Sequence, residues 1–259
     1  MYAMKLLYPL FTTLALAILG ALCQTVPVDA AEIKVSTARL VFTVLREVGS
    51  QFERETGHRL RVTEIYGPPF KKALAAGAPF DLDVLVLRPD YIDDFISEGK
   101  LVAETRTDLV KTGIGVEVRA GAPKPDVSSV EAFKSTLLNA KSIAYLKNGF
   151  DTAYLDSMLE RLGIADAVRA KLVQPETDSV STMTANGEVE LGIAITTQIL
   201  TTPGVELAGG LPPELQRYLV FAGAVSATST VPEAALALLK FLKGPAAIPV
   251  IKAQGMEPG

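Results

Sequence analysis

The sequence predicts an α/β protein of two lobes with a cleft between them. The first observation is an alternation of strand-like and helix-like segments that runs from residue 32 to residue 99. The second is that the alternation starts again near residue 142, after a Pro- and Gly-rich connector at 121–125. The third is length, because 259 residues are enough for two domains of ordinary size.

In the first half, segments 32–36, 60–65 and 81–87 are predicted to be strands. The last is a dense apolar run between charged residues, which is typical of a buried parallel strand. After the first strand, apolar side chains recur at helical spacing up to Gly57, a residue type that commonly ends helices. Shorter helices follow the other two strands and also end at glycines. This βαβαβα order predicts a parallel sheet with helices on both faces.

The second half shows the same order. Strands are predicted at 142–146 and 189–195, with a helix after the first of them. Residues 177–186 are predicted to form another helix, started by a Thr, Asp or Ser cap. An extended run at 217–225 and a helix at 232–242 are expected to carry the chain back to the first lobe.

The first thirty residues differ from the rest of the chain. Lys5 precedes an apolar stretch from Leu6 to Leu22, and Val28-Asp29-Ala30 places small or neutral side chains where a signal peptidase reads them. This pattern predicts a secretory signal peptide cut before Ala31 or Glu32, and therefore a periplasmic protein. The alternative is a membrane anchor, because the apolar stretch is nearly long enough to span a bilayer.

The predicted organisation has three parts. Residues 1–30 form the signal peptide. Residues 31–119 together with 222–259 form the first lobe, and residues 120–221 form the second lobe. The chain is thus expected to pass from the first lobe to the second and back.

Composition argues against several functional classes. The net charge is −4, from 25 basic and 29 acidic residues without a Lys/Arg block, so neither nucleic acid nor an anionic membrane is expected as the partner. The only cysteine, Cys23, lies in the predicted signal peptide, and the only histidine, His58, is predicted to lie on the surface away from the cleft. Thiolate catalysis, a Ser-His-Asp triad and a multi-histidine zinc site are therefore not expected. We predict a monomer that uses no metal and no cofactor.

Ligands of open α/β sheets bind beyond the carboxyl ends of the strands, where loops and helix N-termini meet. In the predicted sheets, these ends carry hydroxyl, amide, guanidinium and ammonium groups. The residues predicted to bind the ligand are Ser36, Thr37, Arg39, Tyr66, Arg88, Lys147, Asn148, Ser179, Thr196 and Thr197.

Several of these residues have a structural alternative. Arg39 would oppose the dipole of the helix that it begins, so a carboxylate-binding role and a solvated position in the first turn both stay open. Lys147 lies in a turn where lysine is common. Asp151 and Asp178 lie at helix starts, where Asp commonly caps backbone N–H groups. In an enzyme, Tyr66 and Asp151 are the candidates to move a proton.

Five stretches in matching order resemble the periplasmic molybdate-binding family. The resemblance implies a class II-like periplasmic binding-protein fold, a small anion held in the cleft by hydroxyls and backbone N–H groups at helix N-termini, and delivery to an ABC permease. The stretches are 33–38, "AAGAPFDLDVLV" at 75–86, "LERLGI" at 159–164, "NGEVELGIAI" at 186–195 and "FLKGPAA" at 241–247.

The loops that would hold the anion depart from that family. Arg39-Leu40 stands where the ligand serine of the family falls, and Tyr66-Gly67-Pro68-Pro69 stands where a serine-rich run is expected. Thr196-Thr197 replaces a turn that carries a tyrosine in the family. These departures argue against molybdate as the ligand.

Four cations lie on the predicted cleft loops instead: Arg39, Lys71, Arg88 and Lys147. A guanidinium group forms paired, planar hydrogen bonds with a carboxylate. We therefore predict a small anionic ligand of the organic di- or tricarboxylate class, bound by a solute receptor that serves a permease or a membrane sensor.

A carboxylate-handling branch of the same family includes an aconitate isomerase. The chain is similar to that branch in length, in its signal peptide and in "LPPELQ" (211–216) and "GMEPG" (255–259). This resemblance implies an alternative function, the interconversion of cis- and trans-aconitate by a proton shift. Such chemistry requires a base and cations for the carboxylates, but no metal or organic cofactor.

Overall fold

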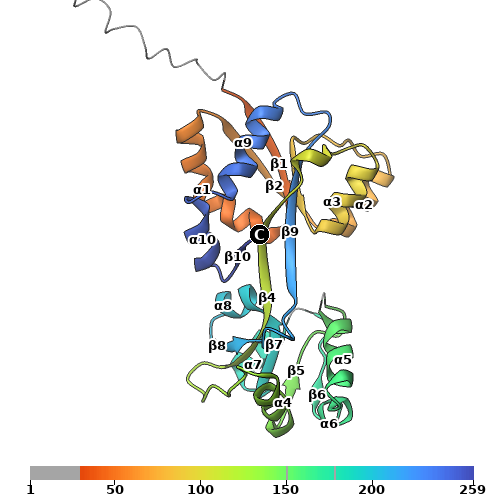
Figure 1. Cartoon of the computed structure of the whole chain (residues 1–259), viewed down its shortest axis with the longest axis vertical. Helices are drawn as coiled ribbons and strands as arrows, with labels where there is room; N and C mark the ends of the chain where they lie inside the picture. The colour runs from red at the N-terminus through yellow and green to blue at the C-terminus, as the bar shows by residue number, and fades with distance from the viewer. Residues whose placement is uncertain (1–29, 150, 178) are drawn as a thin grey trace, which may run out of the picture.

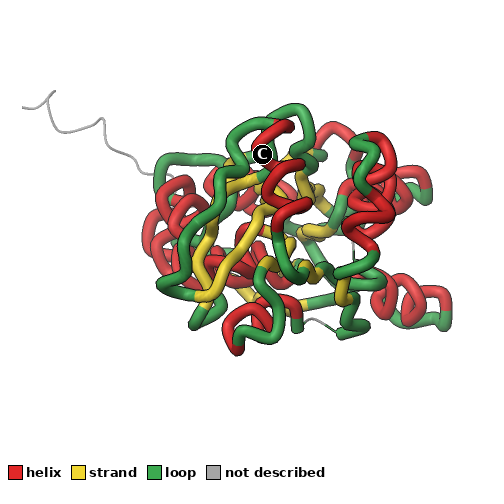
Figure 2. The backbone as a smooth tube through the Cα atoms, turned by 90° about the horizontal axis from the view of Figure 1, so that it is seen from below, coloured by secondary structure: helices red, strands yellow, loops and turns green. Residues whose placement is uncertain are grey.

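The computed structural model describes residues 30–149, 151–177 and 179–259. The predicted signal peptide lies outside this part of the chain, except for its last residue. Figure 1 shows an elongated molecule of two α/β lobes, and Figure 2 shows that the strands lie between the helices. This confirms the predicted fold class.

The first lobe begins with three strand–helix units. Strand β1 lies between β2 and β3 and pairs with both in parallel, as the βαβαβα order predicts. The elements are β1 (Glu32–Thr37), α1 (Arg39–Thr56), β2 (Arg59–Glu64), α2 (Gly67–Ala75), β3 (Val84–Leu87) and α3 (Pro89–Ser97).

Two long strands connect the lobes. After the short helix η1 (Ala103–Thr105), β4 (Thr107–Arg119) runs from the first lobe into the second, and β9 (Tyr218–Val225) runs back beside it. Residues 107–113 of β4 pair antiparallel with β9, whereas residues 114–119 pair antiparallel with the second lobe's strands β7 and β8. One strand therefore belongs to the sheets of both lobes. The proposed boundaries at 119/120 and 221/222 stay a prediction.

The second lobe contains a short parallel arrangement of its own, in which β5 lies between β6 and β7. Its strands are shorter than predicted, because only two residues of 142–146 are paired. The elements are α4 (Val130–Asn139), β5 (Ile143–Ala144), α5 (Thr152–Arg161), α6 (Ala165–Arg169), β6 (Leu172–Val173), α7 (Val180–Asn186), β7 (Leu191–Ile195), α8 (Thr196–Thr201) and β8 (Val205–Gly210).

The C-terminal segment completes the first lobe. It forms α9 (Pro232–Leu242), α10 (Ala247–Ala253) and β10 (Glu257–Pro258), and β10 pairs with β4. Within the described residues, no single helix is long and apolar enough to cross a membrane, although the bent pair α9–α10 passes the same test of length and composition. Leu238 and Leu239 of α9 are buried in the core of the first lobe.

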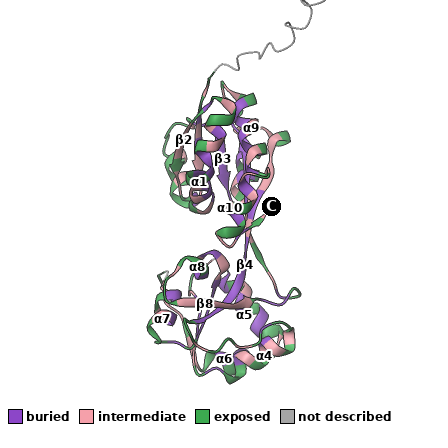
Figure 3. Ribbon diagram, turned by 90° about the vertical axis from the view of Figure 1, so that its left-hand side faces the viewer, coloured by how far each residue is buried: buried purple, intermediate pink, exposed green. Residues whose placement is uncertain are grey.

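Each lobe has its own apolar core, seen as separate buried regions in Figure 3. In the first lobe, α1 buries Val41, Val44, Leu45, Val48 and Phe52, the helical stripe that the sequence predicts. In the second lobe, α4 and α5 bury apolar side chains in the same core as β4 and β7. The molecule therefore has two separately packed halves that strands connect.

The prediction that His58 lies on the surface is wrong. The residue is buried, its ring lies 6.2 Å from that of Phe52, and its Nδ1 accepts a hydrogen bond from the Ala31 backbone N–H at 3.3 Å. The end of α1 and the start of β1 cover it because β2 runs directly beside β1 from its first residue.

Neighbouring leucines of α4 test the core of the second lobe. Leu137 is completely buried, whereas 41% of Leu138 is exposed. We expect Leu137→Ala to lower the free energy of unfolding by about 2–5 kcal/mol, because a cavity remains in the core. Leu138→Ala should change it by less than about 0.5 kcal/mol. Urea unfolding measures both values, and equal losses would contradict the assignment of this core.

Candidate functional site

A cleft lies between the lobes and is made of three adjoining hollows of about 500, 380 and 280 Å³. Ile195, at the end of β7, lines all three, and Leu219 of β9 lines the two smaller ones. The largest hollow takes residues from both lobes, including Arg39 and Thr43 from the first and Thr182 and Gln198 from the second. A ligand in this cleft therefore contacts both lobes.

The N-terminus of α1 supplies positive charge to the cleft. Arg39 begins α1, is exposed, and lines both the 500 and the 380 Å³ hollows. The first turn contains no acidic residue, and Ala38 at the N-cap gives no side-chain hydrogen bond. Among the described residues, no carboxylate forms an ion pair with Arg39. The guanidinium and the helix dipole both favour an anion here.

The two threonines that begin α8 have different roles. Thr196 donates its hydroxyl hydrogen to the Gly113 carbonyl at 3.1 Å and so ties α8 to the connecting strand β4. Thr197 lines the largest hollow, and its buried Oγ1 has no hydrogen-bond partner among the described residues. A buried polar atom without a partner is unfavourable, which makes Thr197 a candidate for a ligand contact.

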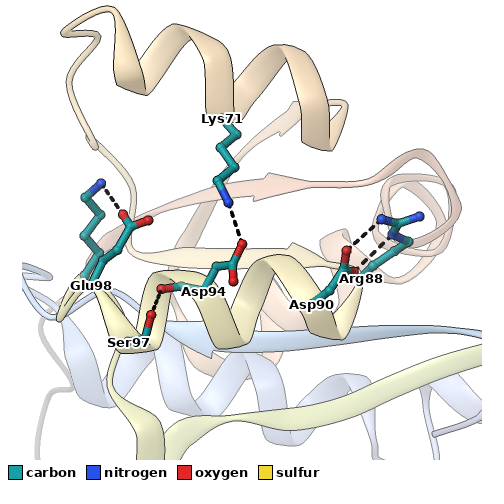
Figure 4. A network of polar contacts seen from close by, with 7 residues as sticks. Lys71, Arg88, Asp90, Asp94, Ser97 and Glu98 are labelled. Carbon is teal, nitrogen blue, oxygen red and sulfur yellow. Dashed lines mark hydrogen bonds and ion pairs between the residues drawn. The ribbon is translucent and has the colours of Figure 1, made fainter.

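Arg88 and Lys71 add less unneutralised positive charge to the cleft than the sequence suggests, because each pairs with a carboxylate. Arg88 lines the 380 Å³ hollow, but its Nε and Nη2 bind Asp90 at 3.1 and 2.7 Å. Lys71 Nζ lies 2.5 Å from Asp94, and that hydrogen bond raises the lysine pKa. Figure 4 shows that both carboxylates come from α3. Lys71 does not line the three hollows, and Arg88 enters the site already paired.

Tyr66 lies at the rim of the cleft. The residue lines the 380 Å³ hollow and is largely exposed, and its hydroxyl donates to Glu64 at 3.1 Å. Ser36 and Thr37 end the neighbouring strand β1 but do not line the three hollows. Their role in binding stays a prediction.

The predicted loop residues of the second lobe also lie outside the lining of these hollows. Lys147 forms an exposed ion pair with Glu176 at 2.7 Å, Asn148 is exposed, and Ser179 donates to the Thr177 carbonyl at 3.2 Å. Asp178 falls outside the described residues. A binding role for Lys147, Asn148 and Ser179 stays a prediction.

Asp151 is a buried carboxyl group in the wall of the cleft. Only 6% of the residue is exposed, and it lines the 280 Å³ hollow. Burial raises the pKa of Asp151, and the charge of Arg217 offsets part of that rise. Its side chain makes no capping hydrogen bond to α5, contrary to the role expected for an Asp at a helix start. Thr152 instead holds the loop, accepting from the Gly149 N–H and donating to the Leu146 carbonyl.

The sequence did not predict the contribution of the C-terminal segment. Gln254 and Met256 line the largest hollow, and Gln254 accepts a hydrogen bond from Thr43 of α1 at 2.7 Å. Thr43 and Gln254 are more than 200 positions apart in sequence, so no local pattern predicts their contact. Among the described residues, no group of three or more His, Cys, Asp or Glu side chains could hold a metal ion.

Comparisons with known proteins agree with this architecture. The model of a family described as bacterial extracellular solute-binding protein matches residues 33–257. An aconitate isomerase from Pseudomonas sp is 30% identical over 97% of this chain and 98% of its own length. The molybdate-binding protein ModA from Azotobacter vinelandii is 30% identical over 92% of this chain and 94% of its own. The tungstate-binding protein TupA from Desulfovibrio alaskensis shares the fold, with a TM-score of 0.66, 18% identity and coverage of 89% of this chain and 99% of its own.

The ionisation of Asp151 gives a test through stability. Because its pKa is raised in the folded state, the ionised carboxylate opposes folding once the pH exceeds the unfolded value of 3.8. We expect Asp151→Asn to raise the midpoint of thermal unfolding at pH 7 by a few degrees, since about 1 kcal/mol corresponds to about 2–4 °C at this chain length. The gain should shrink as the pH falls towards the unfolded pKa.

Asp166→Asn is the matched control, because that side chain is fully exposed and its substitution should leave the midpoint unchanged at every pH. A lower midpoint for Asp151→Asn at pH 7 would show that the carboxylate supports the fold.

Proposed function

The chain belongs to the family of bacterial extracellular solute-binding proteins, and we propose that it binds a small organic di- or tricarboxylate in the cleft between its lobes. The observation that carries this proposal is Arg39, which lines the two larger hollows and has no carboxylate partner among the described residues. The net charge of −4 repels anions at long range, so the attraction has to come from local groups of this kind.

A carboxylate suits this site better than a compact metal oxyanion. Helix N-termini and hydroxyls bind such an oxyanion without a cation. A guanidinium presents two parallel N–H donors that match the two oxygens of a carboxylate. The relatives do not decide between the ligands, because one is named as an aconitate isomerase and another as a molybdate-binding protein.

Binding would act through closure of the two lobes. Arg39 comes from the first lobe, and Thr197 comes from the second. A ligand that contacts both stabilises the closed arrangement over the open one by the difference in its affinity for the two. In the periplasm, the closed receptor would then deliver its ligand to an ABC permease.

A second function, isomerisation of aconitate, is favoured by Asp151. A buried carboxylate with a raised pKa is a suitable proton acceptor near neutral pH. It would take a proton from the methylene carbon of aconitate, and the C=C bond would shift to that carbon as the electron pair moves. The same carboxyl group would return the proton to the former alkene carbon, while Arg39 stabilises the negative charge that develops on a carboxylate.

Substitution of the two cleft arginines tests the carboxylate proposal. We expect citrate or trans-aconitate to stabilise the protein in thermal unfolding and molybdate to have little effect. Arg39→Gln should weaken binding of the carboxylate at least tenfold in titration calorimetry, because it removes the charge that is not neutralised. Arg88→Gln is the control and should change affinity by less than about threefold, since Asp90 already pairs with that charge. Stabilisation by molybdate alone would contradict the proposal.

Proton transfer is tested by following cis-aconitate with NMR in the presence of purified protein. If the chain is an isomerase, trans-aconitate accumulates, and Asp151→Asn lowers kcat by about 10²–10⁴-fold with a small change in KM. Tyr66→Phe should leave kcat nearly unchanged, because that hydroxyl already donates to Glu64. Unchanged cis-aconitate at high protein concentration would eliminate the isomerase and leave the receptor.

A further inference from the structure

A carboxyl group lies completely buried behind one wall of the cleft. Glu117 is on β4 in the second lobe and has no exposed surface. Its Oε2 accepts a hydrogen bond from Ser181 at 2.7 Å, and its Oε1 lies 2.9 Å from the hydroxyl of Thr184. Gly192 of β7 leaves the space for it, because a Cβ atom there would lie 2.2 Å from Oε1. The fold thus provides a dedicated place for this side chain.

Ser181 connects Glu117 with the cleft. It lies in the first turn of α7, beside Thr182, and both residues line the 500 Å³ hollow. A serine hydroxyl has one hydrogen to donate and lone pairs that accept. Since that hydrogen points to Glu117, only the accepting lone pairs of Ser181 remain for a molecule in the cleft.

Thr184 does not depend on Glu117 in the same way. Its hydroxyl also lies 3.1 Å from the carbonyl oxygen of Val180, the residue one helical turn before it. Threonines in helices commonly donate to that position, so Thr184 has a second acceptor within its own helix. Among the described residues, Ser181 has Glu117 as its hydrogen-bond acceptor and no other. Glu117 therefore affects the cleft by orienting the Ser181 hydroxyl.

We propose that Glu117 is a specificity-determining residue of the cleft, which acts by holding the Ser181 hydrogen away from the ligand. The wall then offers an acceptor where an anion would need a donor. A fully deprotonated tetrahedral oxyanion such as molybdate is disfavoured there, because lone pairs face its oxygens. A ligand that brings its own donor, such as a hydroxyl or a protonated carboxyl group, is favoured. This inference rests on the cleft being the anion site of the proposed function.

A double-mutant cycle between Glu117 and Ser181 tests the inference. Glu117→Met keeps a side chain of similar size but removes the acceptor, so Ser181 becomes able to donate into the cleft. We expect this variant to bind molybdate at least tenfold more tightly than the unchanged protein in titration calorimetry. Ser181→Ala in the unchanged background removes the lone pairs that face the anion, so molybdate affinity should not fall and should rise less than in Glu117→Met. The double variant should lose the gain. Circular dichroism checks that each variant is folded.

Two results would overturn the inference: a folded Glu117→Met protein without a gain, or a gain that persists in the double variant. If Glu117→Met does not fold, the molybdate affinity of Ser181→Ala alone tests the inference. A loss of molybdate affinity above threefold shows that Ser181 donates to the anion and overturns the inference, whereas unchanged or tighter binding supports it. The proposed function is tested by a different measurement. If the unchanged protein binds neither citrate nor trans-aconitate, the proposed function is wrong, whatever the molybdate titrations show.

Discussion

The structure depends on the backbone hydrogen bonds of β4. This strand completes the sheet of the first lobe with residues 107–113 and the sheet of the second lobe with residues 114–119. Because one strand serves both sheets, continuous chain joins the two lobes, and Leu87 at the end of β3 and Ile195 at the end of β7 line the same hollow. Ile195 of β7 and Leu219 of β9 line two of the hollows between the lobes.

The two walls of the cleft present different functional groups. The first lobe contributes the guanidinium of Arg39 and the amides at the start of α1, which attract negative charge. The second lobe contributes the buried carboxyl group of Asp151 and Ser181, whose hydroxyl is turned towards Glu117. The first wall suits the ionised end of an organic acid, and the accepting Ser181 hydroxyl of the second wall suits a group that donates a hydrogen bond. This division of roles agrees with a carboxylate ligand and with either receptor or isomerase chemistry.

The α/β class and the repeated strand–helix units could be predicted from the sequence because they rest on local periodicity, as in the apolar stripe of α1. Strand β4 was not predicted as an element, since Gly113 and Gly115 interrupt its pattern and both of its faces are covered. Arg39 was placed correctly at a helix start, because the strand before it ends abruptly. The sequence analysis predicted neither the ion pair between Arg88 and Asp90 nor the hydrogen bond between Thr43 and Gln254. Both depend on side-chain geometry or long-range packing, which spacing along the chain does not specify.

The attachment of β10 has a consequence for how the lobes can rotate. Glu257 and Pro258 pair with Lys111 and Val110, so this stretch of β4 is held on two sides within the first lobe. From residue 114 onward the strand is held by the second lobe. The pivot of such a rotation would therefore be residues 112 and 113, which are paired with β9 but not with β10, β7 or β8. The Gln216 side chain, which binds the N–H and C=O of Ile114 at 2.8 and 3.0 Å, lies at this pivot and would report its movement.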